Sequence, residues 1–176
     1  MGRGALRATR PFTLTSINNM AALLQAQGKL GEAEPLYREA LDGFRRTLGD
    51  SHPSTLTSIN NLASLLQDQG KLGEAEPLLR EALDGYRRTL GDSHPSTLIS
   101  ISNLAALLKA QGKLGEAEPL YREALDGKRR TLGDSHPSTL TSISCMALLL
   151  KAQGKLGEAE PLYREALDGE RRTLGD

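Results

Sequence analysis

The sequence predicts an all-α fold, a solenoid of stacked helix pairs, on three observations. The string GKLGEAEPL begins at Gly28, Gly70, Gly112 and Gly154, so one segment recurs every 42 residues (70 − 28). Each copy contains two stretches in which apolar residues recur at three- and four-residue spacing, which is typical of amphipathic helices. Glycine or proline separates these stretches. A segment of this length cannot bury its apolar side alone, so neighbouring copies are expected to stack and share one core.

The copies follow one another in a constant register. They span residues 9–50, 51–92, 93–134 and 135–176, and residues 1–8 form an N-terminal extension. Each copy is therefore predicted to be one helix-turn-helix repeat, with no second domain beside the array. The sequence leaves open whether these residues are a segment of a longer array, or a consensus-like chain whose function resides elsewhere.

The first helix of the second copy is predicted to begin at Pro53, since proline suits the first turn of a helix. Apolar residues then recur from Leu56 to Leu66. Gly70 ends the helix, because glycine adopts a left-handed turn without a side-chain penalty. The corresponding helices of the other copies follow at the 42-residue period.

The second helix is predicted from Leu72 to Leu90, where Gly91 closes it. Acidic residues in its first turn and arginines in its last turn complement the helix dipole. Pro77 is tolerable only within about the first turn, where an amide hydrogen has no partner inside the helix. Gly85 in the helix interior costs about 1 kcal/mol relative to alanine, so packing in the array is expected to outweigh that cost.

Several segments of the repeat carry a resemblance to a known family. They are the small residues Ala63 and Ala82, the turn Gln69-Gly70-Lys71-Leu72, the run EAEPLLREAL from Glu74, and the connector Leu90-Gly91-Asp92-Ser93-His94-Pro95. On these residues all four copies resemble the tetratricopeptide repeats, in the 42-residue form of the kinesin light chains and nephrocystin-like proteins. The resemblance implies a right-handed α-solenoid of four helix-turn-helix repeats, with eight helices paired antiparallel. It also implies that the first helix of each repeat lines a concave groove.

Composition excludes several classes of partner. The 22 Lys and Arg residues balance the 22 Asp and Glu residues, whereas nucleic acids and anionic membranes favour proteins with a basic excess. No apolar run approaches the ~18 residues of a membrane span, so the chain is expected to be soluble. Its single cysteine, Cys145, fits a reducing compartment, so we expect a cytoplasmic protein. A lone cysteine on a helix is more often an inert small residue than a reactive one.

The motif Asp-Ser-His recurs at residues 50–52, 92–94 and 134–136 and contains the residue types of a hydrolytic triad. A triad brings its members together from different elements, which three consecutive residues cannot do. Equivalent histidines of stacked repeats lie on the order of 10 Å apart, too far to share a zinc ion whose ligands lie at ~2 Å. The aspartate and serine are instead expected to form the turn and cap the helix that the following proline starts. We therefore predict no enzyme, no metal site and no cofactor.

Differences between the copies point to a binding surface on the first helices. Most substitutions between copies two, three and four fall there, whereas charged positions of the second helix, such as Glu74 and Arg80, are identical in every copy. Neutral drift at exposed sites is the alternative, and it would alter both helices equally. The predicted groove residues are polar positions of the first helices, namely Asn18, Asn19, Gln25, Asn60, Asn61, Gln67, Ser102, Asn103, Lys109, Ser144 and Lys151.

These residues indicate the chemistry of a partner. Asparagine and glutamine amides both donate and accept hydrogen bonds, which suits the backbone of an extended peptide. Lys109 and Lys151 replace the glutamines of the first two copies, so an acidic ligand segment is expected there. Ile99 and Leu148 add apolar contact in the same copies. The predicted function is a non-catalytic scaffold that binds a protein or peptide in the groove, with no nucleic acid or membrane partner.

A self-assembling structural protein is the alternative function. Repeat arrays normally end in a polar capping helix, whereas repeat helices are predicted almost to both ends of this sequence, so both ends are expected to expose apolar faces. Such ends can stack head to tail, and a repeating contact that does not close gives a filament. A groove-binding protein is expected to stay monomeric, whereas a stacking protein is expected to grow with concentration.

Overall fold

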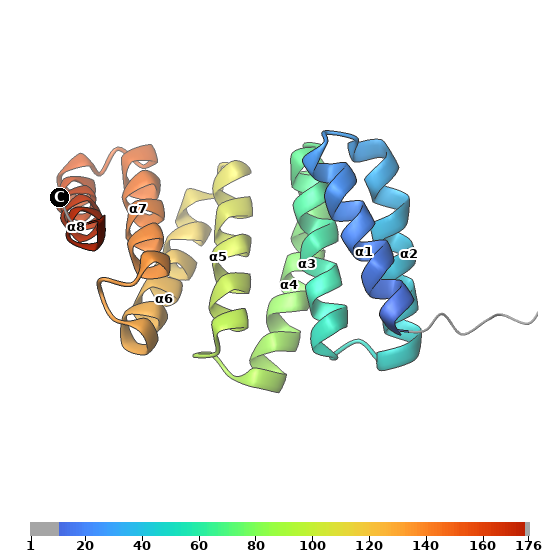
Figure 1. Cartoon of the computed structure of the whole chain (residues 1–176). Coiled ribbons are helices and arrows are strands. Elements are labelled where there is room, and N and C mark those ends of the chain that lie inside the picture. The colour runs from blue at the N-terminus through green and yellow to red at the C-terminus, as the bar shows by residue number, and fades with distance from the viewer. Residues whose placement is uncertain (1–10, 175–176) are drawn as a thin grey trace, which may run out of the picture. The chain divides into compact units, whose positions relative to one another are not determined.

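The computed structural model of the chain describes residues 11–174, which form eight helices and contain no strand (Figure 1). The predicted all-α class is confirmed. The predicted N-terminal extension, residues 1–8, lies outside the described residues. The helices are α1 (Pro11–Ala26), α2 (Leu30–Leu48), α3 (Pro53–Asp68), α4 (Leu72–Leu90), α5 (Pro95–Ala110), α6 (Leu114–Leu132), α7 (Pro137–Ala152) and α8 (Leu156–Leu174).

The chain forms two compact units, which divide after Gly85. In the first unit, α1 pairs with α2, and α3 packs against α2. In the second unit, α5 pairs with α6, α7 packs against α6, and α7 pairs with α8. Each unit is therefore built from a helix hairpin against which the first helix of the following repeat packs.

A histidine-proline pair starts the first helix of repeats two, three and four. In α3 the backbone of His52 is extended, and its Nδ1 accepts a hydrogen bond of 3.1 Å from the backbone N–H of Ser54. Pro53 lies at the first helical position, where it breaks no intrahelical bond. His94 and His136 cap α5 and α7 in the same way.

The prediction that the aspartate and serine of this motif cap the helix is therefore wrong. The carboxylate of Asp92 instead lies 3.2 Å from Arg87 Nε, and that of Asp134 lies 3.4 Å from Arg129 Nε. The aspartates thus hold the end of the preceding second helix, and histidine is the capping residue.

A proline lies inside each second helix, beyond the first turn. Pro77 is the sixth residue of α4, which begins at Leu72, so the expectation that this proline is tolerable only within about the first turn is wrong. The carbonyl that loses its intrahelical donor belongs to Gly73, four residues earlier, and Gly73 is exposed. Water can satisfy that carbonyl, which explains why the helix continues through the proline.

A glycine in each second helix lets the paired first helix approach closely. A methyl group at Gly85 would overlap Cδ2 of Leu56, which is buried on α3. Gly43 faces Leu14 in the same way, and Gly127 faces Leu98. The helix-propensity cost predicted for Gly85 is therefore offset by close packing of the hairpin.

Candidate functional site

The polar positions predicted to line a groove lie on one side of the first helices. On α3, Ile59 and Leu62 are buried, whereas Thr57 and Ser64 on the other side are exposed. We call the exposed sides of α1 and α3 in the first unit, and of α5 and α7 in the second unit, the first-helix face. Asn19 and Lys151 are exposed, and nine predicted site residues are half-buried, namely Asn18, Gln25, Asn60, Asn61, Gln67, Ser102, Asn103, Lys109 and Ser144.

In the first unit, a hydrogen-bond network occupies part of this face. The amide of Gln25 donates to Oδ2 of Asp68 at 2.6 Å and accepts from the hydroxyl of Tyr37 at 2.9 Å. Burial of the Tyr37 ring raises the pKa of its hydroxyl, and the nearby Asp68 carboxylate raises it further. Both ends of the Gln25 amide are therefore used within the chain, so Gln25 is a weaker candidate for ligand contact than Asn19.

In the second unit, the same positions carry positive charge. Lys109 stands where the first unit has Gln25, and Ala152 stands where it has Asp68. The sequences of α5 and α7 contain no Asp or Glu. Among the described residues, neither Lys109 nor Lys151 forms an ion pair, while Ile99 and Leu148 on the same helices are exposed. This face therefore combines uncompensated cations with apolar side chains.

A third lysine lies beneath the face of the second unit. Lys128 on α6 is only 9% exposed, and its Nζ donates to Ser142 Oγ at 2.8 Å and to Ser102 Oγ at 3.4 Å. Burial lowers the pKa of Lys128, and the nearby Cys145 raises it by a smaller amount. No described carboxylate lies within ion-pair distance of its Nζ. The site therefore places a buried ammonium group between α5 and α7.

The sequence contains a signal for Lys128 that was not used in predicting the site. Repeats one and two have Phe44 and Tyr86 at the position of Lys128, and Asn18 and Asn60 at the position of Ser102. In the first unit, Ser58 Oγ donates directly to Asn18 Oδ1 at 3.4 Å. In the second unit the shorter serine leaves room for the ammonium group, which joins the two hydroxyls. The two substitutions are thus coupled through space.

Ion pairs on the second helices join consecutive repeats. Arg45 Nη2 lies 2.7 Å from Glu81 Oε1 in the first unit, and Arg129 Nη2 lies 2.5 Å from Glu165 Oε1 in the second. The identity of these positions in every copy therefore has a structural cause. Positions held by ion pairs are not free to change, so their identity does not show how fast neutral substitutions accumulate. The contrast between the two helices is therefore weaker support for a binding surface on the first helices.

A second set of pairs links the start of each second helix to the turn of the next repeat. Glu118 accepts hydrogen bonds from Lys155 at 2.8 Å and from Gln153 at 3.0 Å, and it also binds Arg122 on its own helix. These donors, with Lys155 the strongest, lower the pKa of Glu118 to about 2. Glu34 of the first unit has the same contacts with Lys71, Arg38 and Gln69.

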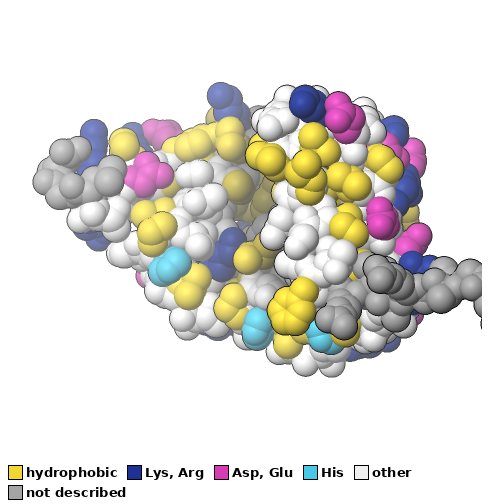
Figure 2. All heavy atoms as spheres, turned by 45° about the vertical axis from the view of Figure 1, so that its right-hand side comes forward, with side chains coloured by type: hydrophobic (Ala, Val, Ile, Leu, Met, Phe, Trp, Pro, Cys, Tyr) yellow, Lys and Arg dark blue, Asp and Glu magenta, His cyan; other side chains and the backbone are white. Residues whose placement is uncertain are grey.

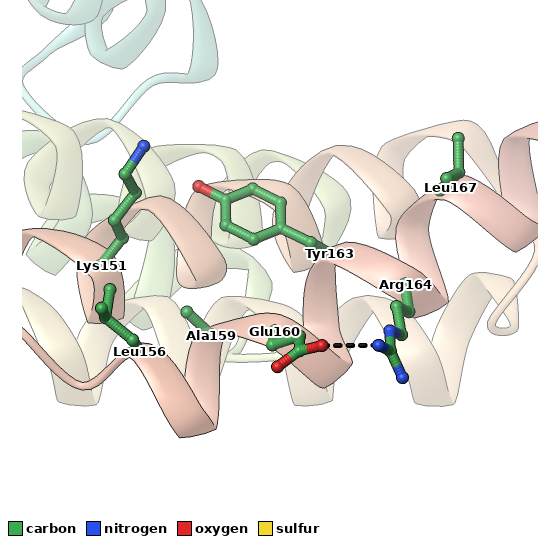
Figure 3. A pocket seen from close by; sticks show the side chains of 7 residues that line it. All are labelled: Lys151, Leu156, Ala159, Glu160, Tyr163, Arg164 and Leu167. Carbon is green, nitrogen blue, oxygen red and sulfur yellow. Dashed lines mark hydrogen bonds and ion pairs between the residues drawn. The ribbon is translucent and has the colours of Figure 1, made fainter.

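The outer side of α8 has a hollow of about 420 Å³ (Figure 3). It is lined by Lys151, Leu156, Ala159, Glu160, Tyr163, Arg164 and Leu167. Figure 3 shows the hydroxyl of Tyr163 directed toward Lys151, and an ion pair of 2.6 Å between Glu160 and Arg164. The predicted site residue Lys151 thus borders both this hollow and the first-helix face.

The outer side of α1 is also apolar. Phe12, Met20 and Leu23 are large hydrophobic residues with exposed side chains. The view in Figure 2 brings the N-terminal unit forward and shows hydrophobic side chains gathered on it, with charged side chains at their edge. Large hydrophobic side chains are therefore exposed on α1 as well as at the hollow of α8.

The described residues contain no cluster of His, Cys, Asp and Glu side chains that could hold a metal ion. None of the helices between residues 11 and 174 combines the length and the hydropathy that a membrane span requires.

Comparison with known proteins gives a consistent result. Three overlapping segments, residues 12–88, 57–130 and 98–172, match the family model described as tetratricopeptide repeat. A solved structure of kinesin light chain-like, nearly identical TPR-like repeats from Podospora anserina aligns with a TM-score of 0.85. It is 31% identical in sequence, over 98% of this chain and 81% of that chain.

Two further structures are similar. A second structure of the Podospora anserina repeats aligns with a TM-score of 0.81 and 32% identity, over 96% of this chain and 80% of that chain. BtubC (BKLC) from P. vanneervenii aligns with a TM-score of 0.86 and 20% identity, over 98% of this chain and 69% of that chain, which is a likeness of fold alone. None of the curated proteins compared by sequence matches the chain.

Proposed function

Because the chain belongs to the tetratricopeptide repeat family, whose model matches it across residues 12–172, we propose that it is a non-catalytic scaffold that binds a protein partner on its first-helix face. The predicted resemblance and the predicted fold class are both confirmed by the comparisons. Proteins of this repeat family generally act as interaction scaffolds. The single cysteine is consistent with a reducing, cytoplasmic location.

The observation that carries the proposal is the charge of the second unit's face. Lys109 and Lys151 have no ion-pair partner among the described residues, and exposed Ile99 and Leu148 lie on the same helices. The acidic residues of an extended segment would neutralise the two lysines, and its apolar residues would cover Ile99 and Leu148. Asn103, half-buried on α5, provides an amide for the peptide backbone. The preferred partner is therefore an acidic peptide segment.

Charge reversal tests this proposal. The probe is a capped, fluorescein-labelled peptide of alternating glutamate and alanine, compared with the same peptide carrying glutamine. Lys109→Glu combined with Lys151→Glu is expected to weaken binding of the glutamate peptide about tenfold, since two attractive contacts become repulsive. Fluorescence anisotropy measures the dissociation constants at one fixed ionic strength, because surface pairs are screened by salt.

The control reverses two exposed arginines that lie away from the first helices. Arg46→Glu with Arg130→Glu changes the net charge by the same amount, in the last turns of α2 and α6. It is expected to leave the dissociation constant within about twofold. Equal weakening by both double variants, or equal affinity for the glutamate and glutamine peptides, would refute the acidic-partner proposal.

The second candidate function is self-assembly by head-to-tail stacking. It is favoured by one observation, that large hydrophobic residues are exposed on the outer sides of both α1 and α8. Light scattering over a concentration series distinguishes the two candidates. A weight-average mass that rises with concentration supports stacking, and a constant mass of one chain supports binding on the first-helix face alone.

A further inference from the structure

We propose that the hollow of α8 is a socket for α1 of a second copy of this chain, in the register with which α6 receives α7. The proposal rests on the second candidate function and gives it a defined interface. It follows from the repeat itself, since α1 carries at its outer side the positions with which α7 contacts α6.

The packing of α7 against α6 is the contact that the socket of α8 would repeat with α1 of a second copy. On α6, Tyr121 and Leu125 are 4% and 5% exposed. On α7, Met146 and Leu149 are 2% and 0% exposed. The first unit repeats this arrangement with Tyr37 and Leu41 on α2, and Leu62 and Leu65 on α3, all of them buried. Two copies of the same contact thus exist within the chain.

The corresponding positions at the outer sides of α8 and α1 are open. Tyr163 and Leu167, which correspond to Tyr121 and Leu125, are 36% and 46% exposed and line the hollow (Figure 3). Met20 and Leu23, which correspond to Met146 and Leu149, are each 52% exposed on α1. One face therefore offers the aromatic and leucine positions of the contact, and the other offers the two side chains that cover them. Burying them together is favourable by the hydrophobic effect.

Charged residues at the two faces are also complementary. Within the chain, Glu118 binds Arg122 on its own helix and Lys155 of the following repeat. At α8 the corresponding Glu160 binds Arg164. Lys29, which corresponds to Lys155, is exposed and has no ion pair among the described residues. A second copy in the same register would place its Lys29 beside Glu160.

The second pair follows the same rule. Arg129 of one repeat binds Glu165 of the next. The corresponding residues at the two faces are Arg171 on α8 and Glu39 on α2, both exposed and without an ion pair among the described residues. Arg171 is positive and Glu39 is negative, so a second copy in this register would place its Glu39 beside Arg171. Since the two mating faces differ, the contact is heterologous, and it extends to a filament unless the assembly closes.

Charge reversal with rescue tests the register. Lys29→Glu and Glu160→Lys each bring two like charges together at the interface, so each is expected to lower the weight-average mass measured by sedimentation at low ionic strength. The double variant Lys29→Glu with Glu160→Lys exchanges the two charges and is expected to recover the wild-type mass. An equimolar mixture of the single variants is expected to recover it as well, since every junction then joins one lysine and one glutamate.

Controls for net charge are available on the exposed side of α2. Arg46→Glu and Asp42→Lys make the same charge changes at exposed positions outside both faces and are expected to leave the mass unchanged. Leu23→Asp places a charge in the apolar contact and is expected to abolish growth, while far-UV circular dichroism confirms that the variant remains helical.

The outcomes separate this interface from the function on which it rests. If the mass of the wild type grows with concentration and neither Lys29→Glu nor Glu160→Lys reduces that growth, the socket is overturned but self-assembly stands. A wild-type mass that stays at one chain at every concentration overturns both. Reduction by the single variants with no recovery in the double variant or the mixture overturns the register.

Discussion

At the scale of single residues, two kinds of glycine in the same helix have opposite consequences. Gly127 in the middle of α6 faces the buried Leu98, whose methyl group a Cβ would overlap. Gly115, in the first turn of the same helix, has no heavy atom within 4 Å of the position of a Cβ. Helix propensity favours alanine over glycine by about 1 kcal/mol at both. Packing therefore decides the sign at Gly127.

Alanine substitution at these two positions is expected to shift stability in opposite directions. Gly127→Ala is expected to lower the free energy of unfolding by about 1–2 kcal/mol, since overpacking outweighs the gain in propensity. Gly115→Ala is expected to raise it by about 0.5–1 kcal/mol. Urea denaturation of the two variants gives both values, and a stabilised Gly127→Ala would contradict the close approach of α5 and α6.

Lys128 shows how one side chain alters the residues around it. Its buried ammonium group disfavours the folded state, yet it also satisfies the hydroxyl of Ser142. Lys128→Phe alone removes the charge and leaves that hydroxyl without its partner. Lys128→Phe with Ser102→Asn restores the arrangement of the first unit, where Ser58 donates to Asn18. We expect the change in the free energy of unfolding of the double variant to be more favourable than the sum of the changes of the two single variants by about 0.5–2 kcal/mol.

The same lysine predicts a pH dependence. Its pKa in the folded state lies below the usual 10.5, so between the two values the unfolded chain binds more protons and stability rises with pH. The stability gained by Lys128→Phe with Ser102→Asn over the wild type should therefore shrink as pH rises toward 10.5. Additive energies together with a difference that does not change with pH would show that Lys128 is not buried as described.

At the scale of helices, the links between repeats depend on carboxylates. The pKa of Glu118 is about 2 in the folded state, below the usual 4.5, because Lys155, Arg122 and Gln153 bind its charged form. Its contribution to stability is complete above about pH 4.5 and is lost as pH falls toward 2. Glu118→Gln is therefore expected to unfold at lower temperature than the wild type at pH 6, with a difference that narrows below pH 4.

A second variant separates the link between repeats from the helix itself. Lys155→Met removes the strongest donor to Glu118 but leaves Arg122 in place. It should reproduce part of the loss at pH 6 and add little to Glu118→Gln when the two are combined. Melting temperatures between pH 6 and pH 2, followed by circular dichroism, measure both effects. Full additivity would mean that the two residues act independently.

At the scale of the whole molecule, the fold could be predicted because the signals that begin and end its helices are local in the sequence. Pro53 and Gly70 bound a helix through their own backbone preferences, so α3 and α4 were located from sequence alone. The capping role of His52 was missed because histidine is not among the usual capping residues. The start of α4 at Leu72 was predicted, but the tolerance of Pro77 beyond the first turn was not, because it depends on the exposure of the Gly73 carbonyl, which the pattern does not report.

The candidate site could be predicted only in part. The exposed side of the first helices follows from helical periodicity, so the accessible positions of Lys109 and Lys151 could be predicted, whereas their contact with a ligand stays a prediction. Use of the Gln25 amide by Asp68 depends on how two helices 42 residues apart are packed, which periodicity does not report. Burial of Lys128 depends on packing between α5 and α7 in the same way. Contacts between a residue and the next repeat could therefore not be predicted from helical periodicity.

The ion pairs between second helices have a consequence for how such a chain changes length. Arg45 meets Glu81, and Arg129 meets Glu165, at the same separation of 36 residues. A tandem duplication of 42 residues in the gene inserts a module whose charged and apolar contacts already match those on either side. An insertion of any other length would place helices out of phase with their neighbours. Whole modules are therefore the increments by which this protein can lengthen or shorten without inventing a new contact.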